Sequence, residues 1–253
     1  MMMIIRNIGP AIKLYNSLRV LEAYRRGIRT ARAAGDDEGE RAYALKAMVT
    51  WGNNLVRIFK IDLRVEGAEH LPDTGPVVFI ANHQGYADIP LCCAALNKFQ
   101  FGFVAKNNLE KVPLYGGWIR DIRSVWMERD DARASLRAIG EGIELIERGF
   151  SLLVFPEGTR SRGGPMKEFK KGSLRLATKP GVPVIPITIN GTWRIYEEKG
   201  VVRNGMPVDF IIHPPIETAG MGKSEANNLS NEVEELIGAT LARLQGADAP
   251  QEV

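Results

Sequence analysis

The chain has 253 residues, of which 45% are hydrophobic and 25% are charged. A chain of this length and composition can bury a sizeable core as one large or two small domains, which excludes a largely disordered protein and makes stabilising disulfides unnecessary. The formal net charge of +3 is too small to indicate a partner by itself.

Residues 1–62 predict a pair of amphipathic helices separated by a turn at Gly35-Asp36-Asp37. Basic side chains dominate before this turn, which suggests contact with an anionic surface, either a nucleic acid or a lipid headgroup layer. Such a pair can dock on the main domain or lie in a lipid interface, and both alternatives stay open. The apolar stripe of the first helix comprises Leu14, Leu18, Leu21 and Ile28, and that of the second comprises Ala44, Met48, Trp51, Leu55 and Ile58.

The chain shows no segment typical of secretion or of membrane crossing. Its start, Met1 to Ile5, is apolar, but Arg6 interrupts it and no longer apolar region follows. No apolar stretch reaches the roughly 18 residues that a membrane-spanning helix needs. We therefore expect a protein that is soluble or lies on a membrane surface.

After Gly67, short apolar runs alternate with helix-like segments. This alternation predicts an α/β fold in which helices cover a largely parallel or mixed central sheet, preceded by the amphipathic helix pair. The predicted strands are residues 77–81, 101–105, 124–127, 151–155, 184–189 and 208–212, and the predicted helices are residues 89–96, 117–122, 132–148, 173–178 and 224–244.

Cysteine and histidine usage indicates neither a disulfide nor a metal site. Cys92 and Cys93 are adjacent in an apolar run, which is typical of buried free thiols in a reducing compartment. His70, His83 and His213 lie too far apart in the sequence for a zinc motif. We expect no metal and no cofactor.

A histidine and an aspartate follow the first predicted strand of the sheet. Residues 77–81 end in Asn82 and His83, and Asp88 stands after four further residues. In open α/β sheets, ligands bind beyond the carboxyl ends of the strands. A loop of this length that contains Gly85 can bring the carboxylate against one imidazole nitrogen, so that the other nitrogen serves as a general base. Asp88 also stands at a predicted helix start, so a simple helix cap stays open as the alternative.

A second polar loop follows the predicted strand 151–155, with the sequence Pro156-Glu157-Gly158-Thr159-Arg160-Ser161. Arg160 can bind a phosphate through two parallel hydrogen bonds, and Gly158 lets the backbone approach a ligand closely. Glu157 suits a substrate hydroxyl or the ordering of the loop better than a phosphate, because like charges repel. A polar surface turn would carry the same residue types, and this alternative stays open.

The two loops together resemble the glycerolipid acyltransferase family, and most closely the 1-acylglycerol-3-phosphate acyltransferases. The resemblance is carried by Asn82-His83, four residues and Asp88, followed about seventy residues later by Phe155-Pro156-Glu157-Gly158-Thr159-Arg160-Ser161. It extends over roughly residues 67–212 and includes two further blocks. These are Lys106 with Leu109, Pro113 and Gly116, and the segment Val182-Pro183-Val184-Ile185-Pro186.

The resemblance implies an acyltransferase that moves a fatty acyl group from acyl-CoA or acyl carrier protein to the free hydroxyl of lysophosphatidate, without an acyl-enzyme. It implies that His83 is the general base and Asp88 its partner. The substrate-binding residues that it implies are Asn82, Lys106, Glu157, Gly158, Thr159 and Arg160, with Lys106 and Arg160 on the phosphate. The same chemistry on another lysolipid, or a non-catalytic lipid-binding protein with this fold, stays open.

For the whole chain, we expect a protein at the cytoplasmic face of a membrane. Residues 1–62 would form the membrane-surface anchor, and residues 63–253 would form the α/β acyltransferase domain. The expected partners are the acyl donor, a lysophospholipid acceptor and the membrane surface. We expect no nucleic acid partner.

Overall fold

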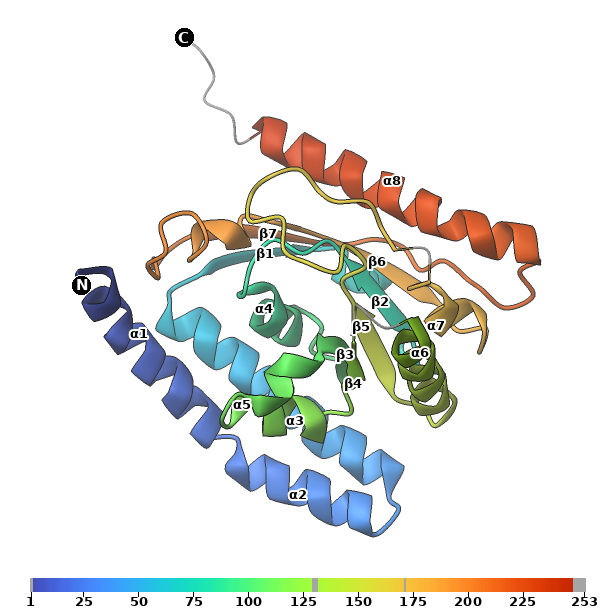
Figure 1. The fold of residues 1–253 in the computed structure, drawn as a ribbon, viewed down its shortest axis with the longest axis horizontal. Helices are drawn as coiled ribbons and strands as arrows, with labels where there is room; N and C mark the ends of the chain where they lie inside the picture. Colours follow the sequence, from blue (N-terminus) through green and yellow to red (C-terminus); the bar gives the residue numbers. More distant parts are fainter. Residues whose placement is uncertain (1, 129–131, 171, 248–253) are drawn as a thin grey trace.

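A seven-stranded sheet forms the centre of the computed structural model, which describes residues 2–128, 132–170 and 172–247 (Figure 1). The strand order is β1-β7-β6-β2-β5-β3-β4, and neighbouring strands are parallel except for β6 and β7. Helices cover both faces of this sheet. The predicted α/β fold with a largely parallel or mixed sheet is therefore confirmed.

The elements follow the predicted order, and every predicted strand is present. The strands are β1 (Asp62–Glu66), β2 (Val78–Ala81), β3 (Phe101–Lys106), β4 (Val125–Met127), β5 (Ser151–Val154), β6 (Val184–Asn190) and β7 (Pro207–Ile212). The α-helices are α1 (Met2–Arg19), α2 (Glu22–Ala33), α3 (Asp37–Ile58), α4 (Asp88–Ala95), α5 (Tyr115–Asp121), α6 (Ala132–Glu147), α7 (Arg175–Thr178) and α8 (Lys223–Ala247). Short 3₁₀ helices are η1 (Ala68–His70), η2 (Asn107–Lys111) and η3 (Thr192–Arg194). The edge strand β1 has no counterpart among the predicted strands.

The core lies in two hydrophobic layers, one on each face of the sheet. Strand β2 supplies both layers: Phe79 and Ala81 pack with α3, α4 and α5, while Val78 and Ile80 pack with α6 and α8. All four side chains are buried. A parallel strand that is covered on both faces needs apolar residues at every position, which explains the uninterrupted apolar run in the sequence.

The predicted N-terminal helix pair is present, and a short turn divides its first member into α1 and α2. The second member, α3, buries Met48, Trp51 and Leu55 against the rest of the domain. Gly52 permits the close contact with α4, because a Cβ atom there would lie 2.5 Å from the backbone nitrogen of Ala94. The apolar stripe of the second helix therefore docks on the domain, which is the first of the two alternatives.

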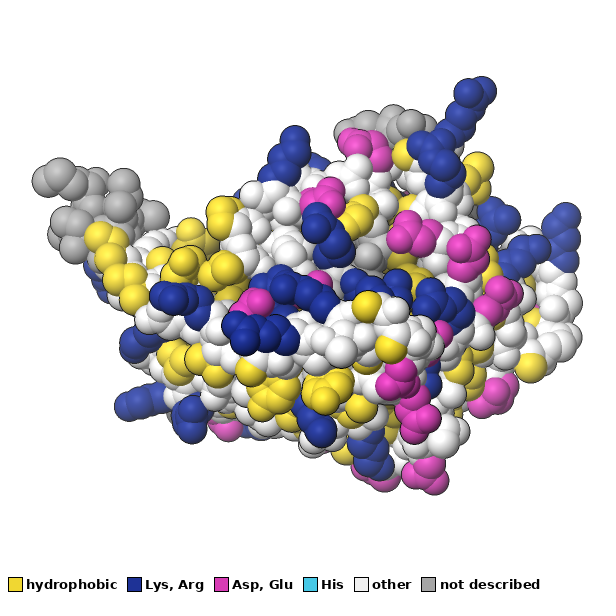
Figure 2. Space-filling model, turned by 90° about the horizontal axis from the view of Figure 1, so that it is seen from below, with side chains coloured by type: hydrophobic (Ala, Val, Ile, Leu, Met, Phe, Trp, Pro, Cys, Tyr) yellow, Lys and Arg dark blue, Asp and Glu magenta, His cyan; other side chains and the backbone are white. Residues whose placement is uncertain are grey.

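Helix α1 keeps an apolar face exposed. Ile8, Ile12 and Tyr15 lie one above the other at helical spacing, and each is about half exposed. Figure 2 shows hydrophobic side chains along α1 and a row of Lys and Arg side chains across the middle of the same view. Asn7 fastens this helix to the loop after β6, where its side-chain amide donates to the carbonyl of Gly200 (2.8 Å). Among the described residues, no helix combines the length and the apolar character that crossing a membrane requires.

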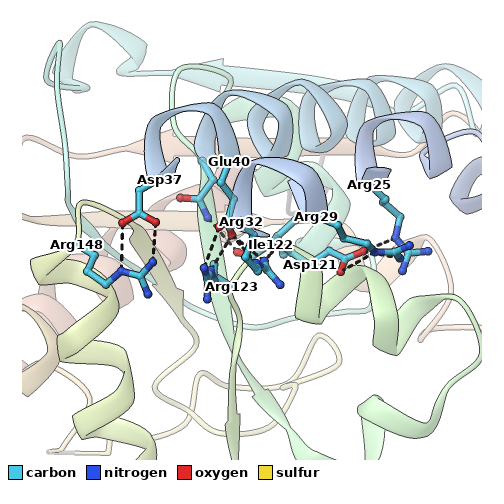
Figure 3. A network of polar contacts seen from close by, with 10 residues as sticks. Arg25, Arg29, Arg32, Asp37, Glu40, Asp121, Ile122, Arg123 and Arg148 are labelled. Carbon is cyan, nitrogen blue, oxygen red and sulfur yellow. Dashed lines mark hydrogen bonds and ion pairs between the residues drawn. The ribbon is translucent and has the colours of Figure 1, made fainter. Parts of the chain in front are cut away.

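A network of ion pairs joins α2 and α3 to the sheet domain (Figure 3). Its two central carboxylates are buried: Glu40 lies in the first turns of α3, and Asp121 ends α5. Each carboxylate is bound by two guanidinium groups: both partners of Asp121 come from α2, whereas those of Glu40 come from α2 and from the segment after α5. The pairs of the network are Arg25–Asp121 (2.6 Å), Arg29–Asp121 (3.0 Å), Arg32–Glu40 (2.7 Å), Arg123–Glu40 (2.7 Å) and Arg148–Asp37 (2.6 Å).

Glu40→Ala is expected to lower the free energy of unfolding by about 3 kcal/mol, because it leaves Arg32 and Arg123 partly buried without their shared carboxylate. Urea unfolding followed by circular dichroism measures this loss. Glu38→Ala is the matched control, since Glu38 is exposed in the same part of α3. Equal urea midpoints for the two variants would show that the network contributes nothing to stability.

Candidate active site

The candidate residues meet at one edge of the sheet. Strands β2, β5 and β3 are neighbours and parallel, so the segments that follow them leave the sheet on the same side. His83 follows β2, Glu157 and Arg160 follow β5, and Lys106 ends β3. The sheet topology therefore brings together the two loops that the sequence singled out.

His83 and Asp88 are in direct contact, as their spacing predicts. Nδ1 of His83 lies 2.6 Å from Oδ2 of Asp88, whose side chain is fully buried. The same Oδ2 accepts from the backbone nitrogens of Gln84 (2.7 Å) and Gly85 (2.9 Å). The hydroxyl of Thr192 donates to the other oxygen, Oδ1. Four donors thus hold the carboxylate against the imidazole.

The helix-cap alternative for Asp88 does not describe this geometry. The N-cap position of α4 is Ala87, which makes no side-chain cap, and Asp88 is already the first residue of the helix. Its carboxylate turns back toward the loop instead of toward the helix amides. The residue therefore orders the loop that carries His83.

The imidazole of His83 is held from a second side by an aromatic ring. It stacks on Phe155, with ring centroids 4.1 Å apart and an interplanar angle of 18°. A carboxylate at Nδ1 favours the tautomer with a proton on that nitrogen, so the lone pair is on Nε2. The side chain of His83 is 15% exposed, which keeps the ring largely buried but open to a ligand on one side.

Glu157 ties the two loops together through its carboxylate. Oε1 accepts from the backbone nitrogen of His83 (2.6 Å), and Oε2 accepts from that of Lys167 (2.9 Å). Burial raises the pKa of Glu157, while the two backbone hydrogen bonds oppose this effect. The sequence suggested that Glu157 either accepts from a substrate hydroxyl or orders the loop, and these contacts match the second role.

Further backbone contacts fasten the two loops to each other. The backbone nitrogens of Ser161 and Arg162 donate to the carbonyls of His83 (2.8 Å) and Gln84 (3.1 Å). The side-chain amide of Asn82 bonds both backbone groups of Ile189 in β6, at 2.9 and 2.7 Å. Asn82 thereby fixes the end of β2 where His83 begins.

Glycine is required at position 158 of the second loop. Gly158 has a φ of +69°, a left-handed conformation that side chains with a Cβ atom rarely adopt. A Cβ atom there would also lie 3.0 Å from Cε and 3.2 Å from Nζ of Lys170. The amino group of this lysine therefore lies beside the turn. Thr159 is exposed at the surface of the same loop.

Arg160 is held on two sides. Its Nη1 lies 2.7 Å from Oε1 of Glu197, and its guanidinium lies 3.5 Å from the centroid of the Tyr86 ring. Lys106, the other predicted phosphate ligand, is exposed at the end of β3. Glu197 and Thr192 are contacts that the sequence did not indicate, since both lie after β6 and outside any recognisable motif.

The fold and the two loops define the class of the protein. A family model described as Acyltransferase matches residues 62–190, about half of the chain, and this range contains both loops. The chain belongs to this acyltransferase family.

Particular relatives are named as lysophosphatidate acyltransferases. The crystal structure of the 1-acyl-sn-glycerophosphate (LPA) acyltransferase PlsC from Thermotoga maritima has a TM-score of 0.71 and 32% identity, covering 92% of this chain and 98% of that one. The chloroplastic 1-acyl-sn-glycerol-3-phosphate acyltransferase LPAT1 of Arabidopsis thaliana is 35% identical over 182 residues, covering 71% of this chain and 49% of the relative. A 1-acyl-sn-glycerol-3-phosphate acyltransferase of Borreliella burgdorferi is 29% identical over 177 residues, covering 70% of this chain and 70% of the relative. This chain spans about half the length of the chloroplastic relatives from Arabidopsis thaliana and Brassica napus.

Proposed function

We propose that the protein transfers a fatty acyl group from an acyl thioester to the free hydroxyl of lysophosphatidate, giving phosphatidate. The observation that carries this proposal is the His83–Asp88 contact beside Arg160, at the sheet edge where β2 and β5 end. The relatives named as lysophosphatidate acyltransferases support the choice of acceptor. The donor is acyl-CoA or acyl carrier protein.

His83 acts as the general base in this proposal. Its Nε2 takes the proton of the acceptor hydroxyl while the hydroxyl oxygen attacks the thioester carbonyl carbon. The tetrahedral intermediate then expels the sulfur, which takes the proton back from the imidazolium and leaves as a free thiol. Asp88 stabilises the imidazolium between these two proton transfers.

Direct transfer fits the cysteines of the chain, because neither is suited to form an acyl-enzyme. Cys92 and Cys93 are both buried in α4, and burial raises the pKa of each thiol above its ordinary value. A thiol with a raised pKa is a poor nucleophile, since the thiolate is the reactive form. The acyl group therefore passes from the thioester to the acceptor in one addition and one elimination.

Arg160 and Lys106 bind the phosphate of the acceptor in this scheme. Charge-assisted hydrogen bonds of this kind are worth about 1.5 to 3 kcal/mol each. Asn82, Glu157, Gly158 and Thr159 complete the substrate-binding residues by shaping the two loops around the acceptor.

The membrane-surface anchor, residues 1–62, is carried chiefly by α1. The apolar stripe of α3 is covered by the domain, whereas Ile8, Ile12 and Tyr15 of α1 are free to enter a lipid interface. Basic side chains near an anionic membrane surface add about 1 kcal/mol each. Residues 63–253 form the acyltransferase domain in this division.

The test is turnover by the purified full chain on lysophosphatidate in anionic vesicles, with acyl-CoA and with acyl carrier protein as donors. We expect phosphatidate and one free thiol per ester formed. Lysophosphatidylcholine and lysophosphatidylethanolamine are run in parallel. If either of those acceptors is turned over as fast as lysophosphatidate or faster, that acceptor is the substrate instead. If none of the three acceptors is turned over, the protein binds lipid without catalysing acyl transfer.

A further inference from the structure

Glu197 connects the predicted phosphate ligand to the loop that carries His83. Its side chain is only 3% exposed, and its Oε1 lies 2.7 Å from Nη1 of Arg160. The same oxygen accepts a hydrogen bond from the backbone nitrogen of Tyr86 (2.8 Å), which lies between His83 and Asp88 in the sequence. One buried oxygen thus holds a residue from each of the two loops.

The contacts to Arg160 fix its guanidinium without using all of its donors. The Tyr86 ring covers one face of the group at 3.5 Å, and Glu197 binds at Nη1. A guanidinium has five N–H donors, so several are left for the oxygens of a ligand. The Arg160 side chain is 17% exposed, which leaves it accessible from one side.

The space for Glu197 depends on a glycine in the His83 loop. A Cβ atom at Gly85 would lie 2.7 Å from Oε2 of Glu197 and 3.1 Å from its carboxyl carbon. Gly85 also donates its backbone N–H to Asp88, the partner of His83. Oε2 itself is buried without a hydrogen-bond partner in the described part of the chain, and it lies against Gly85.

We infer that Glu197 is a positioning residue for acceptor binding, acting through Arg160. It holds the guanidinium at a set place relative to His83, so that a bound phosphate leaves the acceptor hydroxyl within reach of the base. The inference rests on the proposed function, because it needs an acceptor with a phosphate. Gly85 and Glu197 act as one unit in this role, since the first provides the space that the second fills.

The expected signature is a change in the KM for the acceptor at nearly constant kcat. Glu197→Ala frees Arg160 and raises the KM for lysophosphatidate about tenfold or more, the size expected when a charge-assisted contact loses its geometry. Glu197→Gln keeps an amide oxygen for both donors and stays within about threefold of the wild type. Glu198→Ala is the matched control, because its exposed neighbouring side chain pairs with Arg203 instead.

A double-mutant cycle tests the link to the His83 loop. Gly85→Ala pushes the Glu197 carboxylate out of its place and gives the same rise in acceptor KM. In the double variant Gly85→Ala/Glu197→Ala the clash with the carboxylate is gone and only the contact with the Thr192 carbonyl oxygen (3.3 Å) is left, so its KM stays within about threefold of Glu197→Ala alone. If Gly85 and Glu197 had independent roles, the KM of the double variant would rise by the product of the two single-variant increases. Thermal unfolding of every variant identifies any that fail to fold. If Gly85→Ala does not fold, the comparison of Glu197→Ala with Glu197→Gln still tests the role of Glu197.

The outcomes separate this inference from the proposed function. Wild-type turnover with an unchanged acceptor KM in Glu197→Ala overturns the inference and leaves the function standing. A fall in kcat at constant KM assigns Glu197 to the alignment of His83 through Tyr86, and also overturns it. A wild-type protein that does not acylate lysophosphatidate overturns both.

Discussion

His83→Ala is expected to lower kcat/KM for lysophosphatidate by about 100-fold to 10,000-fold, the usual contribution of a general base. Alanine removes the lone pair at Nε2 but leaves the loop in place. The backbone nitrogen of His83 still donates to Glu157, and Asp88 keeps its bonds to the backbone of Gln84 and Gly85. The loss is therefore expected in kcat more than in the KM of the acceptor. Initial rates with a radiolabelled acyl donor measure it.

His70→Ala serves as the control for this prediction. His70 lies in η1 and contacts the carbonyl of Ile212 in β7 (2.8 Å). In the strand order, β7 lies on the opposite side of β2 from β5 and β3. Its replacement is expected to leave turnover unchanged. If His83→Ala kept more than about a tenth of the wild-type rate, another group would have to be the base.

Asp88→Asn is expected to lower kcat about 100-fold or more while the fold is retained. The asparagine oxygen can still accept from His83 Nδ1 and the two loop amides, and its NH₂ group can donate to the hydroxyl of Thr192. What is lost is the negative charge that stabilises the imidazolium during proton transfer. The acceptor KM is expected to stay within about threefold, because Arg160 is untouched.

Steady-state kinetics with a thermal-unfolding check on the same preparation separate the charge effect from misfolding. Asp121→Asn is an instructive comparison, since that carboxylate is also buried but belongs to the ion-pair network and not to the site. It should lower the unfolding midpoint with little effect on kcat. The same pattern for Asp88→Asn, a lower midpoint with normal kcat, would make Asp88 a purely structural residue.

Most of the sheet could be predicted because its strands are buried on both faces and therefore appear as apolar runs. Strand β1 is different: it is an edge strand, four of its five residues are exposed, and charged residues alternate along it. Only its backbone pairing with β7 makes it a strand. The turn between α1 and α2 could not be predicted either, because Leu18 and Leu21 on either side are both buried and continue the helical stripe.

The candidate site could be predicted as far as its residues follow neighbouring parallel strands. His83 and Arg160 lie at such positions, and each occurs in a short polar segment after an apolar run. Glu197 and Thr192 reach the site from a loop about a hundred residues beyond His83, after β6. Contacts of that kind depend on how the loop folds back, and no local pattern encodes them.

The buried ion pairs between α2, α3 and α5 also affect the distance between His83 and a lipid bilayer that binds α1. Asp121 and Glu40 make short charge-assisted hydrogen bonds to arginines, and these contacts hold α2 and α3 on the sheet domain. With α1 seated in the lipid, the imidazole would stand at one set height over the headgroup plane. An amphiphile whose hydroxyl lies at another depth would then be rejected by its geometry, whatever its charge.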